Sequence, residues 1–315
     1  MTAWHPEGFP WFDQPVAEDG YQWWYVDGIS DDDRYGVTLI AFVGSVFSPY
    51  YAWARGRGEG DPAHHCALNV ALYGPKGRWA LTERGRGQLE RDREGMAVGP
   101  SRVRWTGECL EFSIDEWAVP IPRRVRGTVR VYPESIVTRD VVLDSGGLHR
   151  WWPVAPHARV EVEMISPDLR WSGPGYWDGN RGEAPLESAF TGWNWSRAHL
   201  PGGTGLLYEV VERDGRSTCH AFRAAHGGEL EALAPPGPVG LPPGMIWRVP
   251  RATRSEGPAS IVRTLEDTPF YTRSVMRSTL DGHAVEGMHE SLDLDRFASR
   301  WVQLLLPFRM PRIAR

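Results

Sequence analysis

The chain contains 315 residues, 41% of them hydrophobic and 24% charged, and this composition excludes a disordered or low-complexity protein. Its formal net charge of −5 excludes the broad basic surface on which nucleic-acid binding depends. The longest apolar stretch, Val37–Phe47, is interrupted by Gly and Ser and is too short to cross a bilayer.

Short segments with strand character follow one another along the chain, and turn dipeptides such as Asp-Gly and Gly-Gly separate them. In several segments apolar and polar residues alternate, as around Val160 and Val162, which is typical of a strand with one face in water. Only Arg296–Leu306 has the pattern of a short helix. The predicted strands include Tyr21–Ile29, Tyr35–Val46, Cys66–Tyr73, Arg102–Trp105, Glu111–Trp117, Arg124–Tyr132, Ile136–Leu143, Arg159–Ile165, Leu206–Val211, Cys219–Ala224, Ile261–Leu265 and Tyr271–Thr279.

The number of strands predicts more than one sheet. About sixteen strands exceed a single comfortable sheet, and two antiparallel barrels or sandwiches of about eight strands each would accommodate them. We place the boundary within Pro153–Ser166, which gives an N-terminal domain of residues 1–160 and a C-terminal domain of residues 161–315. The three cysteines are too few and too scattered for a disulfide framework, and they favour a reducing cytoplasm.

The segment Leu148–Asn180 concentrates residues that can do chemistry. Residues two apart on a strand point to the same side, so Tyr176 shares a face with Asp178, and His149 shares one with Trp151. If these faces meet, a carboxyl, an imidazole and two electron-rich rings converge. The structural alternative is that the rings fill the core, Asp178 opens an Asp-Gly-Asn turn and His149 caps a loop. The residues by themselves leave both interpretations open.

Long motifs, spread nearly from end to end, resemble those of the carotenoid 1,2-hydratases, also called hydroxyneurosporene synthases. The resemblance implies an all-β fold of two lipocalin-like antiparallel β-barrels packed side by side. It also implies hydration of the terminal C1=C2 bond of acyclic carotenes, namely lycopene, neurosporene and their 1-hydroxy derivatives, with no cofactor and no metal. The motifs include GYQWWYVDGISDD (Gly20–Asp32), HHCALNVALYGP (His64–Pro75), HRWWPVAPHARVEV (His149–Val162), LRWSGPGYWDGNRGEAPLE (Leu169–Glu187) and HESLDLDRFASRWVQLLLPFRMP (His289–Pro311).

The same resemblance assigns the site residues. Asp178 matches the family's proposed acid, and Tyr176, His149 and Trp151 match its partners. We expect an apolar pocket to keep Asp178 protonated, because burial disfavours a carboxylate. Asp178 would then protonate C2, the rings of Trp151 and Tyr176 would stabilise the tertiary cation at C1, and water would capture it. His149 is expected either to orient Asp178 or to accept the proton of the attacking water.

Three further rings of this segment, Trp152, Trp171 and Trp177, are predicted to bind the substrate. The expected partners are an acyclic carotenoid and water, with no nucleic acid. Because the substrate is a hydrocarbon, peripheral contact with the inner membrane is also expected for this cytoplasmic protein. The apolar and basic segment Val302–Met310 suits such a contact, although it also fits a closing core element.

Two other functions stay open from the sequence. A lipocalin-like cyclase or isomerase that acts on another polyene would use the same fold without an acid at Asp178. A non-catalytic carotenoid or lipid carrier would have no reason to bury this carboxyl. A search for a product heavier by one water separates both from a hydratase.

Overall fold

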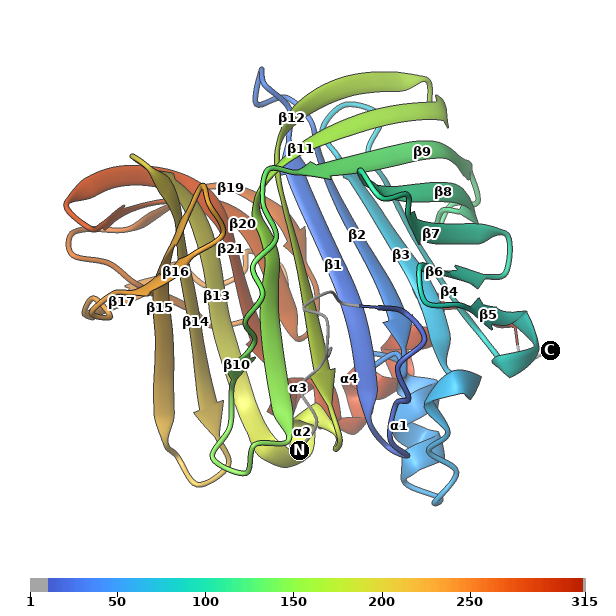
Figure 1. Ribbon diagram of the computed structural model, residues 1–315. Helices are drawn as coiled ribbons and strands as arrows, with labels where there is room; N and C mark the ends of the chain where they lie inside the picture. The colour runs from blue at the N-terminus through green and yellow to red at the C-terminus, as the bar shows by residue number, and fades with distance from the viewer. Residues whose placement is uncertain (1–10, 314–315) are drawn as a thin grey trace. The chain divides into compact units, whose positions relative to one another are not determined.

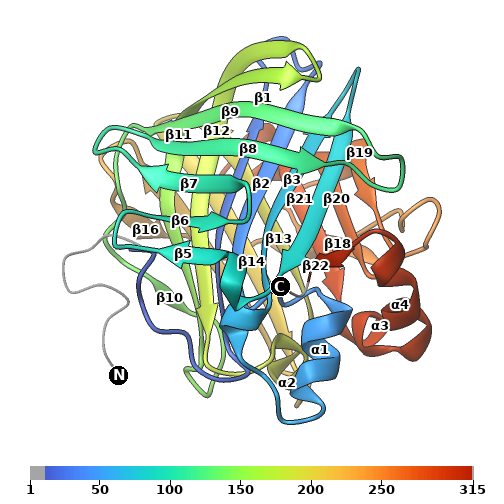
Figure 2. The same ribbon diagram turned by 90° about the vertical axis from the view of Figure 1, so that its right-hand side faces the viewer.

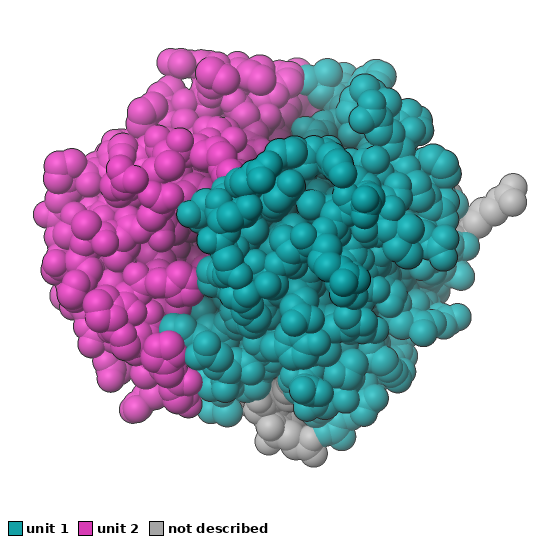
Figure 3. All heavy atoms as spheres, turned by 90° about the horizontal axis from the view of Figure 1, so that it is seen from above, with its two compact units in different colours: residues 1–185, 304–315 teal, residues 186–303 magenta. Residues whose placement is uncertain are grey.

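The computed structural model describes residues 11–313, and antiparallel β-strands make up most of it (Figure 1). The prediction of an all-β fold is confirmed. The chain divides into two compact units, which are unit 1, residues 1–185 with 304–315, and unit 2, residues 186–303 (Figure 3). The predicted boundary between residues 160 and 161 differs from this division, because it falls inside strand β11 (His149–Ser166), which pairs without a break across that point.

Unit 1 is built on a thirteen-stranded sheet in the described part of the chain. The strand order is β22-β4-β3-β2-β1-β12-β11-β9-β8-β7-β6-β5, with β10 beside β11, and the β22–β4 pair is parallel. The strands are β1 Tyr21–Ile29, β2 Gly36–Val43, β3 Cys66–Tyr73, β4 Arg78–Arg84, β5 Leu89–Arg91, β6 Gly95–Val98, β7 Ser101–Trp105, β8 Leu110–Trp117, β9 Arg124–Pro133, β10 Val141–Val142, β11 His149–Ser166, β12 Leu169–Gly182 and β22 Arg312–Ile313.

Two kinds of strand occur in this sheet. Strand β8 alternates buried and less buried residues, as expected for a strand with one face in water. Strands β1, β2 and β3 are buried almost throughout, so both of their faces are covered. Strand β1 therefore presents rings on both sides, with Trp24 and Val26 on one face and Trp23 and Tyr25 on the other.

The sheet of unit 1 curls until its two parts meet. Strands β5–β9 run across the direction of β1–β3 (Figure 2). The Arg84 guanidinium of β4 donates to the Glu116 carboxylate of β8 at 2.7 Å, and the Ser101 hydroxyl of β7 donates to the same carboxylate at 2.7 Å. The Val119 N–H, just after β8, donates to the Trp79 carbonyl of β4 at 3.0 Å. These contacts close the sheet around one interior.

Unit 2 contains a seven-stranded antiparallel sheet in the order β16-β15-β14-β13-β21-β20-β19, and a separate hairpin, β17–β18. Part of its core is the apolar cluster around Leu200, Leu207 and Leu280. The strands are β13 Phe190–Leu200, β14 Gly203–Glu212, β15 Ser217–Ala225, β16 Leu230–Ala232, β17 Pro238–Leu241, β18 Arg251–Arg254, β19 Ser260–Asp267, β20 Tyr271–Leu280 and β21 His283–Asp293.

The helices are short. Helix α3 begins where the Asp293 carboxylate accepts a hydrogen bond from the Arg296 N–H at 2.9 Å, and helix α4 follows it. Together they replace the single short helix predicted at Arg296–Leu306. Within residues 11–313, no helix combines the length and the apolar character that spanning a membrane requires. The helices are α1 Pro49–Arg55, α2 Leu186–Ala189, α3 Leu294–Ala298 and α4 Arg300–Leu305, with 3₁₀ turns η1 Pro62–His64, η2 Arg86–Gln88 and η3 Leu306–Phe308.

Candidate active site

Strands β11 and β12 of unit 1 bring three of the four predicted catalytic residues together. The Asp178 carboxyl is only 4% exposed. The Tyr176 hydroxyl, two residues before it on β12, donates to Asp178 Oδ2 at 2.9 Å. The Trp151 indole N–H, from β11, donates to the same oxygen at 2.9 Å. The acid therefore has two donors on one oxygen, and both donors belong to buried aromatic rings.

The protonation state of Tyr176 follows from its surroundings. Burial raises the pKa of the Tyr176 phenol well above its usual value, and the hydrogen-bonded Asp178 raises it further. Tyr176 therefore remains a neutral hydrogen-bond donor at any physiological pH. Its ring stays available as an electron-rich face next to the acid.

The fourth predicted residue, His149, is buried on the same face but has a different partner. Its Nδ1 lies 2.9 Å from the Tyr21 hydroxyl, and the two rings stack with centroids 5.8 Å apart. His149 is paired with Gly182, four residues along β12 from Asp178, which is about 13 Å of extended strand. Burial lowers the pKa of His149, and this effect exceeds the smaller increase that the charge of Asp144 causes. The imidazole is therefore neutral near pH 7.

Gly182 creates the space in which Tyr21 and His149 meet. A Cβ atom at this position would lie 2.4 Å from Tyr21 Cε1 and 2.6 Å from His149 Nδ1. Both distances are far inside van der Waals contact. The polar end of this face therefore depends on a residue without a side chain.

The structure adds two site residues that the sequence analysis did not select, Tyr25 and Asp27 on β1. Strand β1 pairs with β12 so that Tyr25 lies opposite Asp178 and Asp27 lies opposite Tyr176. The Tyr25 hydroxyl donates to Asp27 Oδ2 at 3.0 Å, and both side chains are buried. One sequence pattern could have pointed to these two residues: the Tyr-x-Asp spacing within Tyr21–Ile29 repeats the spacing of Tyr176 and Asp178.

Trp152, Trp171 and Trp177 do not lie beside the acid. Trp177 is adjacent to Asp178 on β12, so its side chain points to the other face of the sheet. There its ring lies near that of Trp105, with the two ring centroids 5.9 Å apart. Trp152 is paired with Gly179, and its indole N–H donates to the Val137 carbonyl at 2.6 Å. Trp171 is seven residues from Asp178, about 23 Å along the strand. A substrate contact by these three rings stays a prediction.

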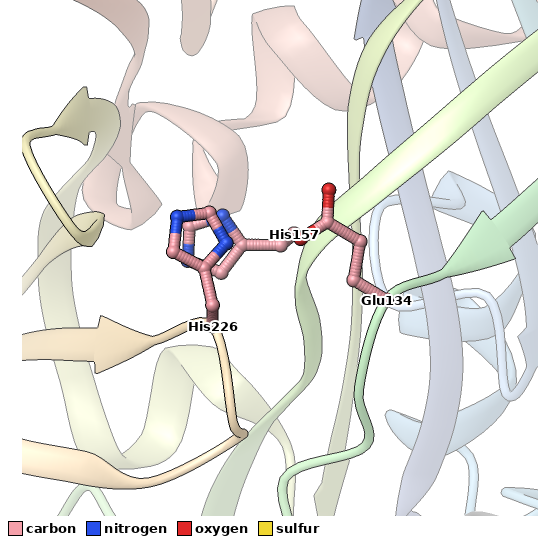
Figure 4. Close-up of side chains that lie close together, drawn as sticks. All are labelled: Glu134, His157 and His226. Atoms are coloured by element: carbon pink, nitrogen blue, oxygen red, sulfur yellow. The ribbon is translucent and has the colours of Figure 1, made fainter.

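A histidine and a carboxylate approach each other elsewhere in unit 1. The Glu134 N–H donates to the His157 carbonyl at 3.0 Å, and Figure 4 shows the side chains of both residues. A structural zinc site takes four ligands and a catalytic one takes three from the protein. Within unit 1, Glu134 and His157 offer two such ligands.

Comparison with known proteins identifies the family. The family model described as carotenoid hydratase CrtC matches residues 39–315. An acyclic carotenoid 1,2-hydratase of Thiocapsa roseopersicina is 52% identical over 311 residues, which cover 98% of this chain and 77% of the relative. One of Rubrivivax gelatinosus is 50% identical over 313 residues, with the same two coverages.

A solved structure shares the fold. A protein of Nitrosomonas europaea described as AttH matches with a TM-score of 0.61 and 16% identity, over 86% of this chain and 91% of its own. The lipocalin-like fold class predicted from the sequence is thus confirmed, and so is the family resemblance. The family match, the two close relatives and the shared fold agree that this chain belongs to the carotenoid hydratase CrtC family.

Proposed function

We propose that this protein is an acyclic carotenoid 1,2-hydratase, a hydro-lyase that adds water to the terminal C1=C2 bond of carotenes such as lycopene, neurosporene and their 1-hydroxy derivatives. No cofactor takes part in the proposed reaction. The observation that carries the proposal is the buried Asp178 carboxyl, which receives hydrogen bonds from Trp151 and Tyr176 on one oxygen.

The first step is protonation of the alkene by Asp178. Burial disfavours the charged carboxylate, and in the proposed step it keeps Asp178 protonated against the two donors, which favour the charged form. Because both donors occupy Oδ2, the acidic proton of the neutral form belongs on Oδ1. That proton passes to C2, and the cation develops on the more substituted carbon C1.

The second step is stabilisation and capture of the cation. The faces of Trp151 and Tyr176 lie next to the acid, and each desolvated cation–π contact contributes about 2 kcal/mol. A neutral Tyr176 cannot intercept the cation as a phenolate would. Water then attacks C1 and leaves a tertiary alcohol. His149 and Tyr21 form the polar end of the same face, and His149 stays a proposed catalytic residue there.

An incubation in isotopically labelled water tests the proposal. Purified protein is mixed with neurosporene or lycopene dispersed in detergent, in H₂¹⁸O or in D₂O, and the products are separated by chromatography. A hydratase yields a product heavier by one water, with ¹⁸O at C1 and deuterium at C2. A cyclase or isomerase yields a product of unchanged mass, and a carrier returns the carotene unaltered. Either of the last two results would refute the hydratase.

The proposal includes a peripheral contact with the inner membrane on the cytoplasmic side. Four apolar residues of α4 and η3 are exposed and are spaced as i, i+3, i+4 and i+7; they are named at the end of this paragraph. Arg300 and Arg309 flank them. Exposed apolar residues with flanking arginines suit the interface of an anionic bilayer, from which a hydrocarbon substrate would enter. We call these residues the apolar stripe: Trp301 (46% exposed), Leu304 (64%), Leu305 (40%) and Phe308 (75%).

A further inference from the structure

Two identical Tyr-x-Asp motifs face each other across neighbouring strands. In the β1 motif the Tyr25 hydroxyl donates to Asp27 Oδ2 at 3.0 Å, and in the β12 motif the Tyr176 hydroxyl donates to Asp178 Oδ2 at 2.9 Å. The antiparallel register places each tyrosine opposite the other motif's aspartate. The two tyrosine rings meet edge to face, with centroids 6.2 Å apart. The site therefore contains two buried carboxyls, each with its own phenol.

Hydration of an alkene needs a proton donor and a proton acceptor. One proton enters at C2, and another must leave the water that attacks C1. Asp178 as the acid supplies the first proton. We propose that Tyr25 and Asp27 accept the second one, an assignment that rests on the proposed hydratase function.

The step conserves atoms and charge. Asp178 gives its proton to C2, and a water oxygen forms the C–O bond to the C1 cation. As this bond forms, the water gives a proton to the Tyr25 hydroxyl oxygen, and Tyr25 gives its own proton to the Asp27 carboxylate. The alcohol leaves with Asp178 as a carboxylate and Asp27 as an acid. Transfer of one proton from Asp27 to Asp178 restores the starting state.

Position favours this pair over His149 as the proton acceptor. Directly opposite residues of an antiparallel pair have Cβ atoms about 5 Å apart, so Tyr25 is an immediate neighbour of Asp178. His149 lies opposite Gly182, four residues further along β12.

The decisive variants are Asp27→Asn and Tyr25→Phe, each of which keeps the shape of the side chain. The titratable groups that face Asp27 are Tyr25 on its own strand, Tyr176 and Asp178 on β12, and Tyr73 on β3, whose hydroxyl donates to Thr38 opposite Asp27. We expect either variant to lower kcat by about 10²-fold or more, because a general base typically contributes that much. Binding of the carotene, followed by quenching of tryptophan fluorescence, should stay unchanged.

The pH profile separates proton transfer from a purely structural role. With an acid and a base, the rate of the native protein falls on both sides of an optimum, and Asp27→Asn should lose the low-pH decline. The double variant should be no slower than either single variant, because both substitutions interrupt one relay. Asp293→Asn is the matched control, since it makes the same Asp-to-Asn change at a helix cap of unit 2 and should retain native activity.

The outcomes distinguish this assignment from the proposed function. If the native protein hydrates carotene but Asp27→Asn and Tyr25→Phe keep its kcat, the assignment is overturned and the hydratase stands. A reduced kcat with an unchanged low-pH decline also overturns it. If Asp27→Asn does not fold, Tyr25→Phe alone decides by the same criteria. Absence of hydration by the native protein overturns both proposals.

Discussion

Replacement of Asp178 by Asn probes the acid with the smallest possible change of shape. The carbonyl oxygen of the amide can take the place of Oδ2 and keep the hydrogen bonds from Trp151 and Tyr176, both 2.9 Å long. The amide cannot act as a Brønsted acid at neutral pH. The variant therefore separates the chemistry of this side chain from its role in packing.

The structure sets the expected magnitudes. Because both hydrogen bonds survive, we expect the free energy of unfolding to change by no more than about 1 kcal/mol. Loss of a general acid typically lowers a rate by about 10²- to 10⁴-fold, which is about 3 to 5 kcal/mol of transition-state stabilisation. The larger figure is expected here, since water is a very poor acid toward an isolated alkene. The effect on turnover should thus exceed the effect on stability several-fold.

The assay combines three measurements on one preparation. Chromatography follows formation of the hydrated carotene, quenching of tryptophan fluorescence follows carotene binding, and denaturant titration follows stability. Asp293→Asn serves as the control, because the capping hydrogen bond that Asp293 accepts at 2.9 Å survives in the amide. Turnover by Asp178→Asn within tenfold of the native rate would refute the assignment of Asp178 as the acid.

Three further predictions concern packing, pH and the membrane. Gly182→Ala should destabilise the protein by about 1 to 3 kcal/mol and reduce turnover, because its Cβ would overlap the rings of Tyr21 and His149; denaturant titration and the product assay measure both effects. Burial lowers the pKa of His289 to about 4, so below pH 6.5 the unfolded chain binds a proton that the folded one does not. Because of His289, the free energy of unfolding should therefore fall by about 2 kcal/mol between pH 6.5 and pH 5. The His289→Gln variant can keep the hydrogen bond to the Ala252 carbonyl but should not show this pH-dependent loss of stability. Serine at all four positions of the apolar stripe should reduce recovery with anionic vesicles in flotation, without lowering turnover of detergent-dispersed carotene.

Each of these has a result that would contradict it. Unchanged stability of Gly182→Ala would mean that the Tyr21–His149 contact is readily displaced. An equal pH dependence of the native protein and of His289→Gln would show that this imidazole is not the group responsible. Equal flotation of the stripe variant and the native chain would place the membrane contact elsewhere.

Many strands could be predicted because apolar and polar residues alternate locally along them. Strand β8 was found at nearly its full length from that pattern alone. Strand β11 was recognised only in its second half, Arg159–Ile165, and its first half contains Pro153 and Pro156. In the folded protein these prolines lie where the register of β11 against β12 shifts, at irregularities that tolerate a missing N–H. The predicted domain boundary also falls within this strand.

A strand that buries a charged residue escaped the sequence pattern. In unit 2, β21 is long and was not among the predicted strands. Glu290 of β21 is buried and accepts a hydrogen bond from the buried Arg273 at 2.7 Å. Charged residues read as exposed in a sequence, and only a partner from another strand can make their burial favourable.

Local patterns in the chain were enough to predict the β class of the fold and the shared face of Tyr176 and Asp178, because a two-residue period is a property of each strand. The family was recognised from the long motifs. That Tyr25 and Asp27, about 150 residues earlier, stand opposite Tyr176 and Asp178, and that Tyr21 is the partner of His149, became visible in the folded protein alone. These contacts depend on the register between strands that are distant in sequence, and a slip of one residue would turn the side chains of β1 to the other face.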